Sequence, residues 1–593
     1  MFCGFQLGGE VTIALTERQR LAGALACLFP FLLHCMLDGG GGSKHWEATF
    51  LYYLAEANRL LGLNDDAMTI YRQPIDAVEQ ARTLSIPSEV SRAGIVSARH
   101  DVFAGTIDFM VSRHREAEAF EIAEAWHARA LLDILTESRV DLTKDLSASQ
   151  REQEDKLFAR ISSVQRELWS AGGRAAPEEE LKMNLARAEN ELESFQLEMR
   201  RSNPRYAGVK YPRPQKAEEI TARFSDDGTA LIEFVLGDQK SFAWIVHGGR
   251  ISSVVLPPRK QIEAVVSNYR AALNEHVSAL TVKTSIASTD LLGSQLYETL
   301  FAPLESQLKG AHSVVIVPDG VLFYLPFESL RRAAVASKKE ADAPYLIERF
   351  AISYAPSATA LRLIQDPKES TTGARGLVAY GDPIYTAVKF DSSSAQTGRG
   401  AELTSLPYTR DEVSAIASLF ALADRHAYTG AEATEASVKS ADLSHIRYLH
   451  FAAHGVIDED NPMRSGIVLS RVAQSNEDGT LQMNEVVRLK LGAEVVTLSA
   501  CRTGLGKVMN GEGVIGLTRA FQYAGAKDVV VSLWNVNDVA TSELMKAFYQ
   551  NLTRGLRKDE ALRQAKLQFL HGARGTWKHP YFWAPFVLNG AND

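Results

Sequence analysis

The sequence predicts a multidomain chain of mixed class, an α region followed by an α/β region, with helical repeats first and a covered sheet after them. Its 593 residues exceed what one hydrophobic core accommodates, so several domains are expected. Up to about residue 200 the apolar side chains recur at helical spacing, whereas after Glu218 short apolar strands alternate with helices. This alternation favours a mostly parallel sheet covered by helices on both faces.

Composition and charge narrow the class of partner. The chain is 46% hydrophobic and 23% charged, as in ordinary soluble proteins, and its net charge is −8. An acidic chain gives no support for a nucleic-acid partner or an anionic membrane surface. Three of the four cysteines lie within the first 35 residues, so no disulfide framework holds the body together. A reducing, cytoplasmic location is therefore expected.

Residues 1–45 form an N-terminal segment with two open interpretations. The stretch 21–37 is nearly all apolar and follows Arg18 and Arg20, as in a signal or anchor segment. It is short for a membrane span, contains Pro30, and lacks a small-residue cleavage site. A buried helix and a membrane or export segment both remain open.

Residues 46–140 have the pattern of paired helices. Small residues recur where helices would pack closely, so tetratricopeptide-like repeats are predicted, with an unrelated helical bundle as the alternative. Either way we expect a module that binds a regulatory protein and has no chemistry of its own. The predicted helices are 48–61, 67–82, 88–113 and 116–136.

Residues 141–215 are predicted to form a helical hairpin and a linker. Apolar residues spaced by three and four make one stripe around Leu157–Leu168 and another around Leu181–Met199. Gly172, Gly173 and Pro177 mark the turn between two antiparallel coiled helices. Three prolines, at 204, 212 and 214, then stiffen the linker.

Residues 216–593 are predicted to form the α/β domain. Three strands between 230 and 256 form an antiparallel meander, with glycines at its turns. The later strands are predicted at 313–318, 376–380, 448–453, 466–470, 494–498 and 528–533. The helices are predicted at 260–274, 291–309, 411–419, 434–440, 513–524, 542–554 and 558–571.

Two of these strands end in residues that form a catalytic pair in cysteine peptidases. Cys501 directly follows the apolar run 495–500, and His454, followed by Gly455, directly follows the run 448–453. Ligands of such sheets bind beyond the carboxyl ends of the strands. A thiol needs a nearby histidine as base or ion-pair partner, because little of it is thiolate at neutral pH. The sequence therefore predicts a His454–Cys501 dyad, the alternative being an inert, buried cysteine.

The flanking residues suggest further roles. The N–H groups of Gly455 and Cys501 would form an oxyanion hole. Beyond the strand 528–533, Asn535 and Asp538 would line the same rim, where Asp538 would attract a basic side chain of the substrate. Asp538 is also a good helix starter, so capping of a helix beginning near Thr541 is an open alternative.

A metal site is not expected. His450 and His454 are four residues apart, but the zinc-protease motif needs a helix and a glutamate where Phe451 stands. On a strand the two histidines share one face, so His450 is predicted to lie deeper, either in packing or as a partner that supports a site residue. Neither a metal nor another cofactor is predicted.

Several motifs in order resemble the CHAT domain, the caspase-like domain associated with tetratricopeptide repeats and related to separase. The resemblance covers roughly 220–593 and is strongest after 403. Its motifs are Val317–Gly320 with Leu325–Phe327, Tyr354–Ser357, Leu449–Gly455, Leu498–Gly504, Gly511–Gly513 and Ser532–Asp538.

The resemblance implies a caspase-like fold and a cysteine endopeptidase that needs no cofactor, in a largely bacterial family. The family dyad falls on His454 and Cys501. The expected function is a peptidase that cleaves a specific protein and is gated by the helical region. The alternative is a scaffold or adaptor that uses the same fold to bind without cutting.

Overall fold

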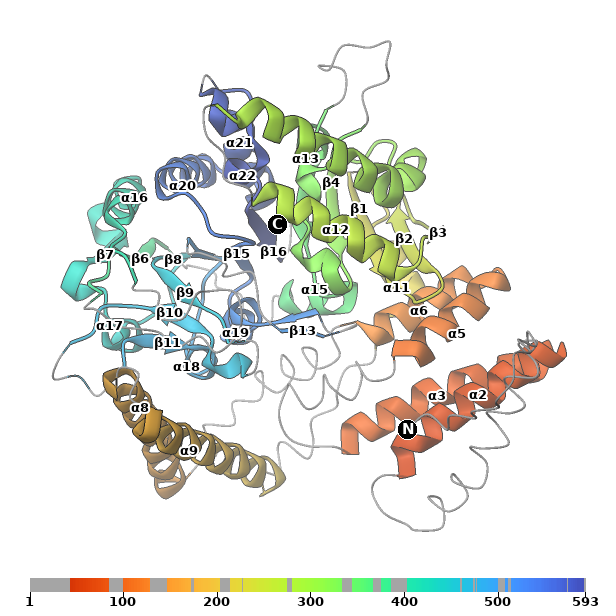
Figure 1. Cartoon of the computed structure of the whole chain (residues 1–593), viewed down its shortest axis with the longest axis horizontal. Coiled ribbons are helices and arrows are strands. Elements are labelled where there is room, and N and C mark those ends of the chain that lie inside the picture. The colour runs from red at the N-terminus through yellow and green to blue at the C-terminus, as the bar shows by residue number, and fades with distance from the viewer. Residues whose placement is uncertain are drawn as a thin grey trace, which may run out of the picture.

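A computed structural model shows helices at the amino end and a large sheet that fills the rest of the chain (Figure 1). It describes residues 43–84, 100–127, 147–171, 175–202, 214–226, 228–274, 280–332, 344–365, 375–385, 403–458, 461–472, 475, 477–499, 507–509, 513–572 and 574–590.

The amino-terminal helices come in two pairs. The first pair is α2 (Ser43–Leu61) with α3 (Asn64–Leu84), and the second is α5 (His100–Ser112) with α6 (Glu116–Trp126). Tyr71 of α3 stacks on Phe109 of α5 at 4.3 Å between ring centroids, which joins the pairs.

The helix predicted at 116–136 is observed as α6 up to Trp126, and residues 128–136 lie outside the described ranges. Helix α6 stops at Trp126 because His127 has an extended backbone, with φ −83° and ψ 134°. The imidazole of His127 bonds instead to the carboxyl of Glu233, in the sheet, at 2.8 Å.

The predicted hairpin consists of α8 (Ala148–Ala171) and α9 (Ala175–Ser202). Its two apolar stripes meet in a small core made of Phe158, Ile161, Leu185, Ala188 and Leu192. In Figure 1 the hairpin lies beside the lower edge of the sheet domain, close to β11 and α18 (bounds below).

The large sheet has 11 strands in the order β3-β2-β1-β4-β5-β16-β15-β12-β8-β6-β7. Most neighbours are parallel, and the predicted antiparallel meander continues this sheet at one end as β1–β3. The bounds are β1 Thr229–Val235, β2 Ser241–His247, β3 Arg250–Leu256, β4 Ser313–Val317, β5 Ala351–Tyr354, β6 Leu377–Gly381, β7 Arg425–Thr429, β8 Tyr448–Ala452, β12 Val495–Leu498, β15 Asp528–Ser532 and β16 Phe586–Asn589.

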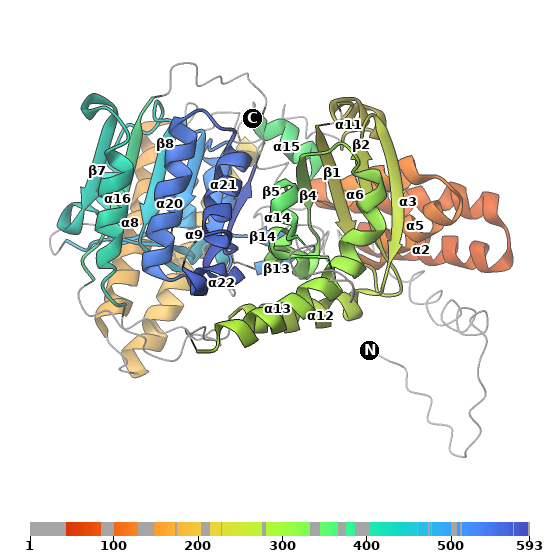
Figure 2. The same cartoon turned by 90° about the horizontal axis from the view of Figure 1, so that it is seen from above.

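Helices cover the sheet. Three of them, α16, α20 and α21, stand side by side over its carboxyl-terminal half (Figure 2). The bounds are α11 Ala217–Arg223, α12 Arg259–Leu273, α13 Val282–Leu296, α14 Leu346–Arg349, α15 Ala358–Gln365, α16 Pro407–Ala417, α17 Glu435–Ser440, α18 Met483–Val486, α19 Leu517–Tyr523, α20 Asp538–Thr553, α21 Lys558–Leu570 and α22 Pro580–Trp583.

Strand β1 separates two hydrophobic cores, because its side chains alternate between the faces of the sheet. Ile232 and Phe234 join the core beneath α12 and α13. Leu231 and Val235 join the core that also contains the buried side chains of the amino-terminal helices. The helical region is therefore packed directly on the sheet.

A second, three-stranded sheet was not predicted. Its order is β11 (Thr480–Gln482), β10 (Gly466–Val468) and β9 (His454–Val456). The strand predicted at 466–470 thus belongs here and not to the large sheet. The helix predicted at 513–524 is also wrong at its start, because Gly513–Ile515 form strand β14 against β13 (Lys507–Met509) and α19 begins at Leu517.

The predicted fold class is confirmed: paired helices, a helical hairpin and a helix-covered α/β sheet. The domain boundaries at 45, 140 and 215 stay predictions. No helix in the described ranges is both long and apolar enough to cross a bilayer. The apolar stretch 21–37 lies outside those ranges.

Candidate functional site

The two strands expected to deliver the dyad are neighbours. β8 and β12 run parallel, with Leu449 opposite Val496 and Phe451 opposite Leu498. The pairing extends past the strand end, where the N–H of Ser499 donates to the carbonyl of Phe451 at 2.8 Å. Parallel strands have their carboxyl ends at one edge of the sheet, so the segments after β8 and β12 leave from adjacent points.

Cys501 lies outside the described residues, as does the rest of 500–506. The described chain reaches Ser499, two residues before it, and resumes at Lys507. The separation of the Cys501 sulfur from the His454 imidazole therefore stays a prediction, and so does the oxyanion role of the Cys501 N–H.

His454 is the first residue of β9, two positions after the end of β8. Its Nε2 lies 2.8 Å from the carbonyl oxygen of Thr404. A carbonyl only accepts, so Nε2 carries the proton and, in the neutral ring, Nδ1 is the basic nitrogen. This contact gives the imidazole one defined tautomer, as a general base requires.

Two further contacts hold His454. Its backbone N–H donates to the hydroxyl of Tyr385 at 3.0 Å. The Tyr385 ring lies against the imidazole, with 4.9 Å between centroids and 51° between planes.

The protonation of His454 reflects opposing influences. Burial lowers the pKa of His454 below its ordinary value, while the Thr404 carbonyl and the charge of Asp538 act to raise it. Burial raises the pKa of Asp538, and His454 acts to lower it. The net result favours a neutral imidazole at pH 7, which is the form that accepts a proton.

Gly455 follows on the same edge strand. The backbone bonds Leu469 N–H to Gly479 O and Met483 N–H to Ser465 O turn the odd-numbered residues of β10 toward β11. The even-numbered Gly466 and Val468 therefore face β9, opposite Val456 and His454. The polar groups of Gly455 consequently point away from β10, and its role as an oxyanion donor stays a prediction.

Beyond β15, the cap of the following helix is not the residue considered from the sequence. Helix α20 begins at Asp538 and not near Thr541, and its cap is Asn537, whose side chain accepts the N–H of Ala540 at 3.1 Å. The capping alternative for Asp538 is wrong, because Asp538 is already the first helical residue. Substrate contacts of Asp538 and of Asn535, whose carbonyl accepts the Tyr581 hydroxyl at 3.0 Å, stay predictions.

His450 lies deeper on β8, fully buried, as predicted from its position four residues before His454. Its Nε2 is 2.9 Å from a carboxylate oxygen of Glu412 on α16, and its ring packs edge-on against Tyr549. These contacts fit a packing role.

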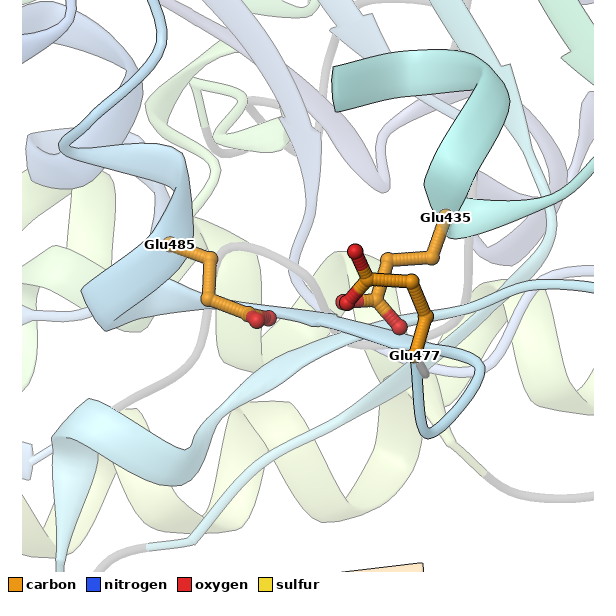
Figure 3. Close-up of side chains that lie close together, drawn as sticks. All are labelled: Glu435, Glu477 and Glu485. Carbon is orange, nitrogen blue, oxygen red and sulfur yellow. The ribbon is translucent and has the colours of Figure 1, made fainter. Parts of the chain in front are cut away.

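One cluster in the described ranges has the geometry of a metal site. Glu435, Glu477 and Glu485 bring carboxylate oxygens within 4.8 Å of one another (Figure 3). The ammonium of Lys439 lies 2.6, 2.6 and 2.7 Å from these three carboxylates. The lysine thus provides the positive charge that a metal would supply.

Sequence reasoning missed Tyr385 and Thr404. Tyr385 follows β6, which is parallel to β8 and ends at the same edge, so its place after a predicted strand was a usable signal. Thr404 acts through its main-chain carbonyl, which any residue type would supply, so no signal existed.

Comparison with known proteins agrees with the predicted family. A family model of the CHAT domain matches residues 290–591, half of the chain. Tetratricopeptide repeat protein 28 of Homo sapiens is 27% identical over 341 residues, which cover 50% of this chain and 13% of the human protein. The Mus musculus protein of that name is 25% identical over 346 residues, again 50% of this chain and 13% of the relative. The chain thus spans a small part of these relatives.

Two solved structures are distantly similar. The Saccharomyces cerevisiae separase–securin complex has a TM-score of 0.40 and 9% identity, covering 96% of this chain and 48% of that chain. The Arg-specific cysteine proteinase gingipain R has a TM-score of 0.30 and 10% identity, covering 56% of this chain and 74% of that chain. The match of the family model over half of the sequence shows that the chain belongs to the CHAT domain family.

Proposed function

We propose that the chain is a cysteine endopeptidase in which Cys501 is the nucleophile and His454 the general base. The supporting observation is the state of His454. It is a partly buried imidazole with Nε2–H bound to Thr404, on a segment that leaves the sheet beside the one leading to Cys501.

In the proposed reaction, Nδ1 of His454 takes the thiol proton and the sulfur attacks the peptide carbonyl carbon. The carbonyl oxygen becomes an oxyanion, for which the N–H groups of Gly455 and Cys501 are the proposed donors. The imidazolium then gives its proton to the leaving amine as the C–N bond breaks. Water hydrolyses the thioester and restores the thiol. No step requires a metal or another cofactor.

The proposed gate is the helical region, and the hairpin provides contacts through which it would act. Glu189 of α9 holds the guanidinium of Arg464 with two bonds of 2.7 Å and accepts a bond from Asn461 at 3.2 Å. Both partners belong to the connection between β9, which carries His454, and β10. Gln165 of α8 and Gln482 of β11 exchange two amide bonds, of 3.0 and 2.7 Å. A protein that moves the hairpin would therefore act on the strand of His454.

The experiment is a comparison of cleavage sites in cell extracts, by mass spectrometry of new protein amino termini. Wild-type protein is compared with Cys501→Ala and with His454→Ala. His426→Ala serves as control, because His426 is an exposed histidine on β7, a different strand from those that lead to His454 and Cys501. New termini with wild type and His426→Ala, and none with the other two variants, are expected. Equal sets from all four proteins would contradict the proposal.

A scaffold that binds without cutting is the second candidate. It is favoured by the names of the curated relatives, which refer to repeats and not to an activity. Under this hypothesis Cys501→Ala would retain the cellular role of the protein, whereas variants that weaken partner binding would lose it.

A further inference from the structure

We infer that Tyr385 is a positioning residue for His454, and that its hydroxyl links the two strands β9 and β10 at the residue that carries the imidazole. This inference rests on the proposed function, since it assigns Tyr385 a role in orienting the proposed base. It concerns a residue that precedes the site by 69 positions in the chain.

The first observation is the place of the hydroxyl. His454 and Val468 are register partners whose polar groups face each other, so a regular antiparallel ladder would join them directly. At this pair the N–H of His454 also donates to the Tyr385 hydroxyl at 3.0 Å, and that hydroxyl donates to the carbonyl of Val468 at 3.3 Å. The phenol hydroxyl thus bonds to both members of this pair, one on β9 and the other on β10.

The second observation is how fully His454 is fixed. Tyr385 holds the main chain through its hydroxyl and packs its ring against the imidazole at 4.9 Å. Thr404 accepts the proton of Nε2 at 2.8 Å. Backbone position, ring packing and tautomer are therefore defined together, and two of the three depend on Tyr385.

The third observation is that the segment before Tyr385 is itself anchored. The N–H of Ile384 donates to the hydroxyl of Ser470 at 2.7 Å, just past β10. The N–H of Asp382 donates to the Thr409 hydroxyl at 2.8 Å, and its carboxylate binds Arg410 at 2.8 Å. Both partners lie on α16. A tyrosine held in this way provides a rigid reference for a base.

Backbone conformation points the same way. Asp382 has a φ of +48°, one of two positive values among the described non-glycine residues. Left-handed backbone is unfavourable for residues with a Cβ and persists where surrounding contacts impose it. Here the contacts of Asp382 turn the chain just before Tyr385 reaches His454.

The test compares Tyr385→Phe, which keeps the ring and removes the hydroxyl, with Tyr408→Phe as control. Tyr408 is on α16 with 48% of its surface exposed. We expect Tyr385→Phe to lower kcat by about 3- to 10-fold with KM unchanged, the size expected from one or two hydrogen bonds. Tyr408→Phe should match the wild type. A variant Tyr385→Phe with wild-type kcat would overturn the inference.

A second readout does not depend on peptidase activity. In protein with ¹⁵N-labelled histidines, the His454 signals are assigned by their loss in His454→Gln, and their titration is followed by NMR. Tyr385→Leu should raise the pKa of His454 toward its ordinary value, because the ring that helps to bury the imidazole is gone. Tyr385→Phe should leave that pKa in place. An unchanged pKa in Tyr385→Leu would also overturn the inference. If no variant or wild type cleaves peptide, this titration still decides the role of Tyr385, whereas the proposed function alone fails.

Discussion

At the scale of single residues, ionisable groups are withdrawn from solvent in two places: the imidazole of His454 partly, and three side chains of the core fully. His454 is kept neutral and has one defined tautomer, which suits proton transfer. Glu124, Glu233 and His127 instead lie in the core between α6 and the sheet, where they join two parts of the molecule. Burial perturbs the pKa in both places, so a shifted pKa alone does not identify a catalytic group.

Asp538→Asn should extend peptidase activity toward lower pH. The charge of Asp538 acts to raise the pKa of His454, so removing it lowers that pKa further. The neutral, basic imidazole then persists to lower pH, and the acid limb of the kcat/KM profile moves down. A shift of this limb to higher pH would contradict the electrostatic role. Loss of affinity only for substrates with a basic residue would instead support the predicted substrate contact.

Glu233→Gln should make stability less dependent on pH. Burial raises the pKa of Glu233 and of Glu124 to about 8. The folded protein then holds protons that the unfolded chain releases above the ordinary glutamate pKa of 4.5. This stabilisation is complete below pH 4.5 and is lost as pH rises through about 8. The variant should gain on the order of 1–3 kcal/mol over wild type near pH 8. If the free energy of unfolding, measured by denaturation, changed equally with pH in the two proteins between pH 5 and 8, the expectation would be contradicted.

At the scale of elements, the sequence predicted most strands and helices of the sheet domain but not how the strand at 466–470 pairs. Apolar content marks this segment as a buried strand but does not say which strands it pairs with. Its partners are His454–Val456 and Thr480–Gln482, and three residues are too few for periodicity to reveal a strand. The short strands β5, β7 and β16 of the large sheet were missed for a related reason. Each has only four or five residues.

Glu189→Ala should slow the modification of Cys501 by thiol reagents, with Glu191→Ala as matched control. Glu189 reaches out to Arg464, beyond β9, while Glu191 pairs with Arg160 inside the hairpin at 2.7 Å. Both substitutions remove one charge from α9, but only the first frees the connection that follows His454. Equal rates of modification in both variants, measured by mass spectrometry, would show that the hairpin does not act on the site.

At the scale of the whole molecule, the helical region and the sheet form one packed body. Glu124 of α6 accepts the N–H groups of Ala358 and Thr359 at 2.8 and 2.9 Å, so it holds the start of α15. The sequence predicted both regions but not this contact, because a buried glutamate in an apolar helix resembles a surface position until its partners are known. The family model begins at residue 290, although β1–β3 belong to the same sheet.

Glu124→Gln should destabilise the protein by about 2–3 kcal/mol at pH 7. In Glu124 each carboxyl oxygen accepts one backbone N–H of α15, whereas the amide NH2 group of glutamine cannot accept, so one of these N–H groups loses its partner. Glu233→Gln is the comparison, since it leaves both carboxyl oxygens of Glu124 in place as acceptors for α15. Chemical denaturation followed by tryptophan fluorescence measures both. Equal losses in the two variants would contradict this account of the contact.

The rate at which iodoacetamide alkylates Cys501, measured between pH 5 and 9, tests the His454–Cys501 pair most directly. Wild type and His426→Ala should react readily at pH 6–7, and His454→Ala should react at least about tenfold more slowly there, because an unassisted thiol is mostly protonated at that pH. Identical rate profiles for wild type and His454→Ala would contradict the pairing of these two residues.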